Sequence, residues 1–150
     1  MKSLNSIRDL NLEGRAVFLR LDLNVPMQDG VITSDARIQA ALPTIRYAME
    51  RGARLALASH LGRPKGKRDP QASLDPVGMR LSELLDCEVI LADDCIGDGV
   101  KGLLQRPNPD SVILLENLRY HAGEESEEMF RAVGIALDFF NTEVTKYDKQ

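Results

Sequence analysis

Four short apolar runs, separated by segments with helical spacing, constrain the fold of this 150-residue chain more than any other feature. The runs are residues 16–21, 53–58, 88–92 and 111–115. Each is too short for a typical buried helix, and polar or charged residues follow each one, as they follow buried strands. Strands that alternate with helices favour a parallel sheet covered by helices on both faces. The sequence therefore predicts an α/β fold, a three-layer sandwich with a mainly parallel sheet.

The segment between the first two runs predicts a hairpin and then a helix. The Asp-Gly pair at residues 29–30 is a tight-turn signal, so a small hairpin should follow the first strand. Ser34 or Asp35 can cap the next helix, Pro43 should kink or divide it, and Gly52 suits its C-terminal cap. The apolar residues of this helix recur at helical spacing and are Ile38, Ala41, Leu42, Ile45 and Met49.

The later helices are marked by prolines and by charge. Asp75-Pro76 suits the first turn of a second helix, and a short third helix should end before Pro107. Four glutamates within residues 124–128 favour the start of a last helix, because a helix N-terminus attracts negative charge.

Polar side chains that follow the predicted strands should meet at one edge of the sheet. Right-handed crossovers bring the carboxyl ends of parallel strands to the same edge, which is where Rossmann-like sheets bind ligands. The candidate binding residues at this edge are Asp22, Asn24, His60, Arg63 and Arg119, with Arg37 from the first turn of the first helix.

The loop after the second strand, residues 59–68, is basic and rich in glycine. It reads Ser-His-Leu-Gly-Arg-Pro-Lys-Gly-Lys-Arg, and the chain carries no acidic residue between Glu50 and Asp69. Its glycines and proline disfavour a helix and let the backbone approach a neighbour closely. The loop is typical of an anion site, with a solvated surface loop as the alternative. We expect its last three basic residues to lie at the rim and to attract the ligand.

Three arginines and one histidine at this edge carry more positive charge than one neighbouring carboxylate can neutralise, so they indicate an anionic ligand. Guanidinium groups bind phosphate or carboxylate through paired hydrogen bonds. Asp22 would accept from a ligand hydroxyl or orient an arginine, while Asn24 can donate and accept. The predicted ligand is therefore small, doubly anionic and hydroxylated. Alternatively, Asp22 and Asn24 are turn residues and Arg37 is an exposed helix residue.

Composition and charge exclude several classes of protein. The net charge of −4 argues against a nucleic-acid binder, and no apolar run approaches the roughly 20 residues that cross a bilayer. The N-terminus does not resemble a signal peptide. Cys87 and Cys95 lack metal-type spacing, so we assign no metal ligand in this chain and interpret His121 as a capping or packing residue. We expect a cytoplasmic protein with reduced thiols.

Five segments, in order, closely resemble the N-terminal domain of phosphoglycerate kinase. They are Arg20-Leu21-Asp22-Leu23-Asn24-Val25-Pro26, Arg37 to Ile45, Ser59 to Gly66, Ala92-Asp93-Asp94-Cys95-Ile96-Gly97, and Leu114-Leu115-Glu116-Asn117-Leu118-Arg119-Tyr120. The resemblance implies a family that transfers a phosphoryl group between ATP and the carboxylate of 3-phosphoglycerate, with magnesium. It also implies the residues that bind 3-phosphoglycerate, namely Asp22, Asn24, Arg37, His60, Arg63 and Arg119. Arg37 resembles the family's arginine that stabilises the transferring group and is the expected catalytic residue.

The resemblance also sets the expected domain limits. Residues 1–138 should form an incomplete phosphoglycerate kinase N-terminal domain, and residues 139–150 a divergent tail. The family's nucleotide domain, with its Mg-ATP ligands, has no counterpart in these 150 residues. We therefore expect the 3-phosphoglycerate-binding half, a monomer that is inactive alone. The alternative is a non-catalytic module for an anionic metabolite, or half of a split enzyme that pairs with a separate nucleotide-binding domain.

Overall fold

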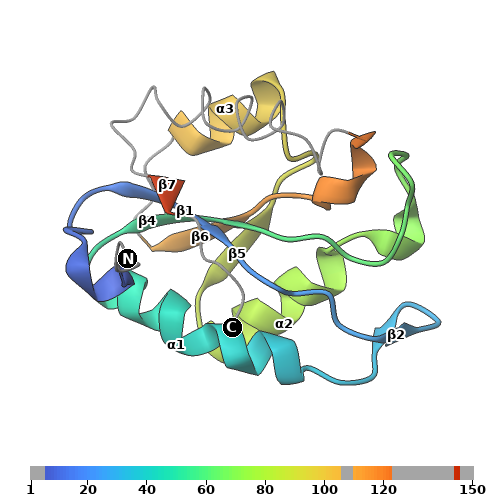
Figure 1. Ribbon diagram of the computed structural model, residues 1–150, viewed down its shortest axis with the longest axis horizontal. Coiled ribbons are helices and arrows are strands. Elements are labelled where there is room, and N and C mark those ends of the chain that lie inside the picture. Colours follow the sequence, from blue (N-terminus) through green and yellow to red (C-terminus); the bar gives the residue numbers. More distant parts are fainter. Residues whose placement is uncertain (1–5, 106–109, 123–143, 146–150) are drawn as a thin grey trace, which may run out of the picture.

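A parallel sheet lies at the centre of the chain (Figure 1). The computed structural model describes residues 6–105, 110–122 and 144–145, and the structural statements below concern these residues. The strands lie in the order β5-β6-β4-β1-β7, and every neighbouring pair is parallel. Their bounds are β1 Ala16–Arg20, β4 Arg54–Ala58, β5 Glu88–Leu91, β6 Ser111–Leu114 and β7 Val144–Thr145. All four predicted apolar runs form strands.

Helices cover both faces of this sheet. Helices α1 (Ala36–Glu50) and α2 (Asp75–Leu85) lie on one face, and α3 (Asp98–Gln105) lies on the other (Figure 1). The described residues also form three short 3-10 turns, η1 (Ile7–Asp9), η2 (Pro70–Ala72) and η3 (Leu118–Tyr120). The predicted three-layer α/β sandwich is confirmed.

Alternation along the strands divides the hydrophobic core between the two faces. Leu19, Leu57 and Leu114 point into the larger core, which contains the apolar sides of α1 and α2. Phe18 and Ala56 point the opposite way, into a smaller core beneath α3. Successive strand residues face opposite sides, so a strand covered on both faces must be apolar throughout. This is why the strands appear in the sequence as continuous apolar runs.

A small antiparallel hairpin, β2 (Met27–Gln28) and β3 (Val31–Ile32), projects from the end of β1 as predicted. Asp29 and Gly30 connect its strands with φ angles of 52° and 76°. Both lie in the left-handed region that a tight hairpin turn requires, where aspartate and glycine are well tolerated. The hairpin carries the chain from β1 to α1, and so sets where α1 begins.

Helix α1 corrects one prediction and qualifies another. It continues through Pro43, so Pro43 does not divide it, and the alternative that Pro43 kinks the helix stays a prediction. Pro43 costs Gln39 the partner of its carbonyl, and both residues are exposed, so water can replace that partner. Asp35 occupies the N-cap position but makes no capping bond, since its carboxylate binds Arg80 instead at 2.9 Å. Gly52 follows the helix with a φ of 79° and ends it as predicted.

The end of the chain contributes one short strand. Val144 and Thr145 pair with Phe18 and Leu19 at the edge of the sheet. The helix predicted from residue 124 lies outside the described residues, as does most of the predicted tail. Among the described residues, no helix has the length and apolar character needed to cross a membrane.

Candidate functional site

Three strand ends converge on one glycine. Asn24, which follows β1, accepts a hydrogen bond through Oδ1 from the backbone N–H of Gly62 at 2.9 Å. Arg119, in η3 after β6, donates from Nη1 to the carbonyl oxygen of Gly62 at 3.3 Å. Gly62 itself lies in the loop after β4, between His60 and Arg63. The carboxyl ends of β1, β4 and β6 therefore share one edge, as the sequence predicts.

Arg37 reaches the same edge from the first turn of α1. Its Nη1 donates to the Asp22 carboxylate at 3.2 Å and to the carbonyl oxygen of Asn24 at 2.7 Å. The two side chains of this ion pair are each about half exposed. Both contacts use the same nitrogen, so Nε and Nη2 of Arg37 have no partner among the residues that the structure describes. Asp22 thus orients an arginine, one of the two roles predicted for it.

The remaining two predicted residues lie beside Gly62. His60 is half-buried, and Arg63 is exposed with no hydrogen bond or ion pair among the described residues. An exposed guanidinium next to a loop held from two sides can bind an anion without first breaking an internal contact. The structure thus brings all six predicted residues to one edge, and their roles as ligands stay a prediction.

The rest of the basic loop packs against η3. Gly66 donates its N–H to the carbonyl of Arg119 at 3.1 Å and has a φ of 74°. A side chain there would meet the backbone of Ala122 at 3.2 Å, so this close approach requires glycine. Arg68, which was also expected at the rim, donates to the carbonyl of Asp93, which follows β5, and stacks on the Tyr120 ring. Lys65 and Lys67 are exposed, as expected for the rim.

Sequence reasoning missed the residue that holds these loops together, Asn117. This fully buried side chain donates through Nδ2 to the carbonyls of Leu61 and Ala72 at 2.7 and 2.8 Å. Its Oδ1 accepts from the N–H groups of Leu61 and Arg119 at 3.2 and 3.0 Å. One side chain therefore fixes the loop after β4 relative to the turn that carries Arg119.

Two further buried polar residues support the edge. Ser59 accepts from the N–H of Leu23 at 2.9 Å, which joins the ends of β1 and β4. Glu116 accepts from the N–H of Leu74 at 2.8 Å and from the hydroxyl of Ser73 at 2.7 Å. The available signal was their position: each polar residue comes directly after an apolar run, where a buried strand meets its loop.

The comparisons with known proteins agree with this geometry. A family model described as phosphoglycerate kinase matches residues 7–143. This chain belongs to the phosphoglycerate kinase family. The phosphoglycerate kinase of Bdellovibrio bacteriovorus is 52% identical over 136 residues, which are 91% of this chain and 34% of that protein. The phosphoglycerate kinase of Anaeromyxobacter dehalogenans strain 2CP-C is 54% identical over 129 residues, or 84% of this chain and 33% of that protein.

Solved phosphoglycerate kinase structures share the fold. That from Pyrococcus horikoshii OT3 superimposes with a TM-score of 0.78 and 36% identity, over 87% of this chain and 34% of that one. The phosphoglycerate kinase structure from Coxiella burnetii gives a TM-score of 0.75 and 39% identity. The match covers 89% of this chain and 33% of that one. The chain therefore spans about a third of the length of the phosphoglycerate kinases it matches, and it corresponds to their N-terminal part.

Proposed function

We propose that the edge described above binds 3-phosphoglycerate, as the acceptor side of a phosphoglycerate kinase that acts in glycolysis in the cytoplasm. The observation that carries this proposal is the convergence of Asn24 and Arg119 on the two backbone groups of Gly62. This arrangement holds two arginines and a histidine around one loop. 3-Phosphoglycerate offers a carboxylate, a phosphate and a hydroxyl, which match that set of donors.

The charge of each side chain determines which group of 3-phosphoglycerate it is proposed to bind. Arg63, Arg119 and His60 bind the anionic groups, while the Asn24 amide and the Asp22 carboxylate recognise the hydroxyl. Arg37, held by Asp22, is positioned to stabilise charge on the phosphoryl group during transfer from ATP to the 3-phosphoglycerate carboxylate. Such stabilisation acts through position and electrostatics, and requires no covalent chemistry from the protein.

Mg-ATP is not assigned to this edge. A hard cation such as Mg²⁺ prefers carboxylate, carbonyl and water oxygens, whereas the edge consists mainly of guanidinium and imidazole groups, and its carboxylate, Asp22, is paired with Arg37. We assign no residue of this chain to the nucleotide. The 150-residue polypeptide by itself is therefore proposed to bind 3-phosphoglycerate without transferring a phosphoryl group.

Calorimetric titration of the chain with 3-phosphoglycerate tests the binding proposal. We expect saturable binding that weakens at least tenfold in R63A, because a charged hydrogen bond contributes about 1.5–3 kcal/mol. R51A is the matched control, since Arg51 is exposed and precedes β4 at its opposite end. Equal affinity of R63A and R51A, or no saturable heat in the unaltered chain, would contradict the proposal. A coupled assay showing ATP-dependent turnover would contradict only the claim of inactivity.

A further inference from the structure

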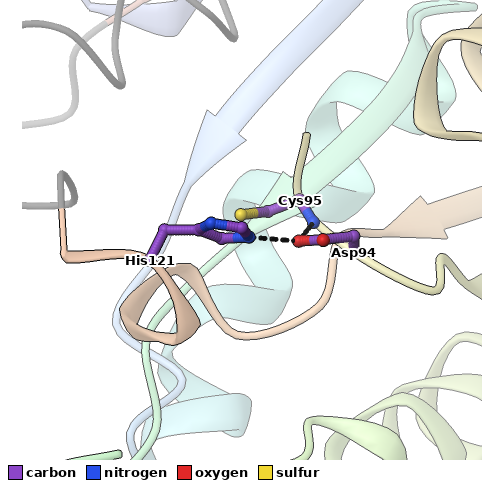
Figure 2. A group of neighbouring side chains, drawn as sticks. All are labelled: Asp94, Cys95 and His121. Carbon is purple, nitrogen blue, oxygen red and sulfur yellow. Dashed lines mark hydrogen bonds and ion pairs between the residues drawn. The ribbon is translucent and has the colours of Figure 1, made fainter. Parts of the chain in front are cut away.

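Three side chains with different donor atoms meet on the α3 side of the sheet, and none of them is among the six residues proposed to bind substrate. Asp94 and Cys95 lie between β5 and α3, and His121 directly follows η3 (Figure 2). A carboxylate oxygen, the Cys95 sulfur and an imidazole nitrogen all lie within 4.8 Å of one another. His121 is far from Cys95 in the sequence, so residue spacing could not reveal this cluster.

In this cluster Cys95 is buried, whereas Asp94 and His121 are partly exposed to solvent. Cys95 is 1% exposed and belongs to the smaller core, so the fold fixes the position of its sulfur. The side chains of Asp94 and His121 are each 33% exposed, and their hydrogen bond, Nε2 to Oδ1, measures 2.6 Å. An ion arriving from solvent can therefore reach Asp94 and His121 directly, and the buried sulfur lies within 4.8 Å of their donor atoms.

The charges around the sulfur favour a cation. The Asp94 carboxylate accepts from the N–H of Cys95 at 2.7 Å and is bonded to His121 Nε2 at 2.6 Å, so an acidic group lies beside the sulfur. The nearby Arg68 is engaged elsewhere, with the carbonyl of Asp93 and the ring of Tyr120.

We propose that Asp94, Cys95 and His121 bind a thiophilic divalent ion of the Zn²⁺ class. Sulfur, imidazole nitrogen and carboxylate oxygen are the ligands that Zn²⁺ takes in proteins, and three of them leave a fourth tetrahedral position for water. On binding, the Cys95 thiol releases its proton to solvent and forms the sulfur–metal bond. The proton that His121 Nε2 donates to Asp94 leaves that nitrogen, to solvent if the ring is charged or by a shift to the Nδ1–H tautomer if it is neutral. One bond from each residue to the ion then replaces the His121–Asp94 hydrogen bond.

Titration of the chain with Co²⁺, a coloured substitute for Zn²⁺, tests the proposal. We expect one equivalent to bind with the absorption that marks a cobalt–thiolate bond, and Zn²⁺ to displace it. C95S should remove this absorption, and H121Q should weaken binding at least tenfold. C87S is the matched control, because Cys87 is the other free thiol and lies outside the cluster. Circular dichroism of each variant checks its folding.

Two results would overturn the proposal. One is that the unaltered chain shows no thiolate absorption with excess Co²⁺. The other is that the absorption survives in C95S and is lost in C87S. If C95S does not fold, H121Q decides the question because its side chain lies partly in solvent: unchanged Co²⁺ affinity in H121Q then also refutes the site.

Discussion

The proposed substrate edge has an inner half that is buried and an outer half that is exposed. The inner half consists of Ser59, Glu116 and Asn117, which are buried and hydrogen-bonded to backbone groups of neighbouring loops. The outer half includes Arg37 and Arg63, which are exposed and lie where a ligand can reach them. The inner residues fix the backbone and the outer ones face solvent, so substitutions in the two halves should separate stability from binding.

The largest effect is expected for N117A. The substitution removes four hydrogen bonds and leaves buried backbone groups of Leu61, Ala72 and Arg119 without partners. Since each such loss costs about 1 kcal/mol, the free energy of unfolding should fall by about 3 kcal/mol or more. Urea denaturation followed by circular dichroism measures this change.

N11A is the control for this substitution. Asn11 is exposed and accepts one weak hydrogen bond, from the N–H of Glu13 at 3.4 Å. Its replacement should change the free energy of unfolding by less than about 0.5 kcal/mol. If N117A and N11A were equally stable, the inner half would not hold the loops together.

R37K tests the outer half. Arginine bonds Asp22 and the Asn24 carbonyl through one nitrogen, Nη1, and keeps its other guanidinium N–H groups for an anion. Lysine keeps the positive charge but has a single nitrogen, so it cannot do both. Calorimetry should show roughly tenfold weaker binding of 3-phosphoglycerate, since about 1.4 kcal/mol corresponds to a factor of ten, with unchanged urea denaturation. R46K, on the same helix, should bind normally. If R37K lowered stability without weakening the binding of 3-phosphoglycerate, Arg37 would behave as an inner residue, and the division between the two halves would be wrong.

The fold could be predicted from the sequence because its signals are local. The strand at residues 53–58 is apolar from Leu55 onward because both of its faces are buried, and the turn at residues 29–30 requires residues that tolerate positive φ. The continuation of α1 through Pro43 was not predictable, because the effect of a proline depends on which side of the helix faces water. That depends on tertiary packing, which the local sequence does not determine.

The outer half of the edge was also predictable, because charged residues after apolar runs stand out and parallel topology brings them together. The hydrogen-bond partners of the inner half were not predictable. Asn117 acts through bonds to Leu61 and Ala72, which lie far from it in the sequence, and no local pattern encodes those partners. The same holds for Cys95 and His121, whose proximity arises only when η3 folds back beside the loop after β5.

S59A should have a moderate effect on stability. It removes the acceptor of the buried Leu23 N–H but leaves the backbone contact between Ser59 and Leu118 intact. We expect the free energy of unfolding to fall by about 1–2 kcal/mol. The control S34A removes an exposed acceptor at 3.4 Å and should have little effect in the same urea denaturation. If S59A lowered the free energy of unfolding as much as N117A does, the inner residues would stabilise the edge cooperatively rather than independently.

The smallest effect is expected for the Asp22–Arg37 ion pair. The two side chains are 45% and 50% exposed, and water screens charges at such positions, so their coupling should stay below about 0.5 kcal/mol without ligand. A double-mutant cycle with D22A and R37A, followed by urea denaturation, measures it. The Arg80–Asp35 pair, which is less exposed and makes contacts of 2.9 Å from both Nε and Nη2, should couple more strongly. A stronger coupling between Asp22 and Arg37 would mean that the outer half also contributes to stability, and that the division between the two halves is false.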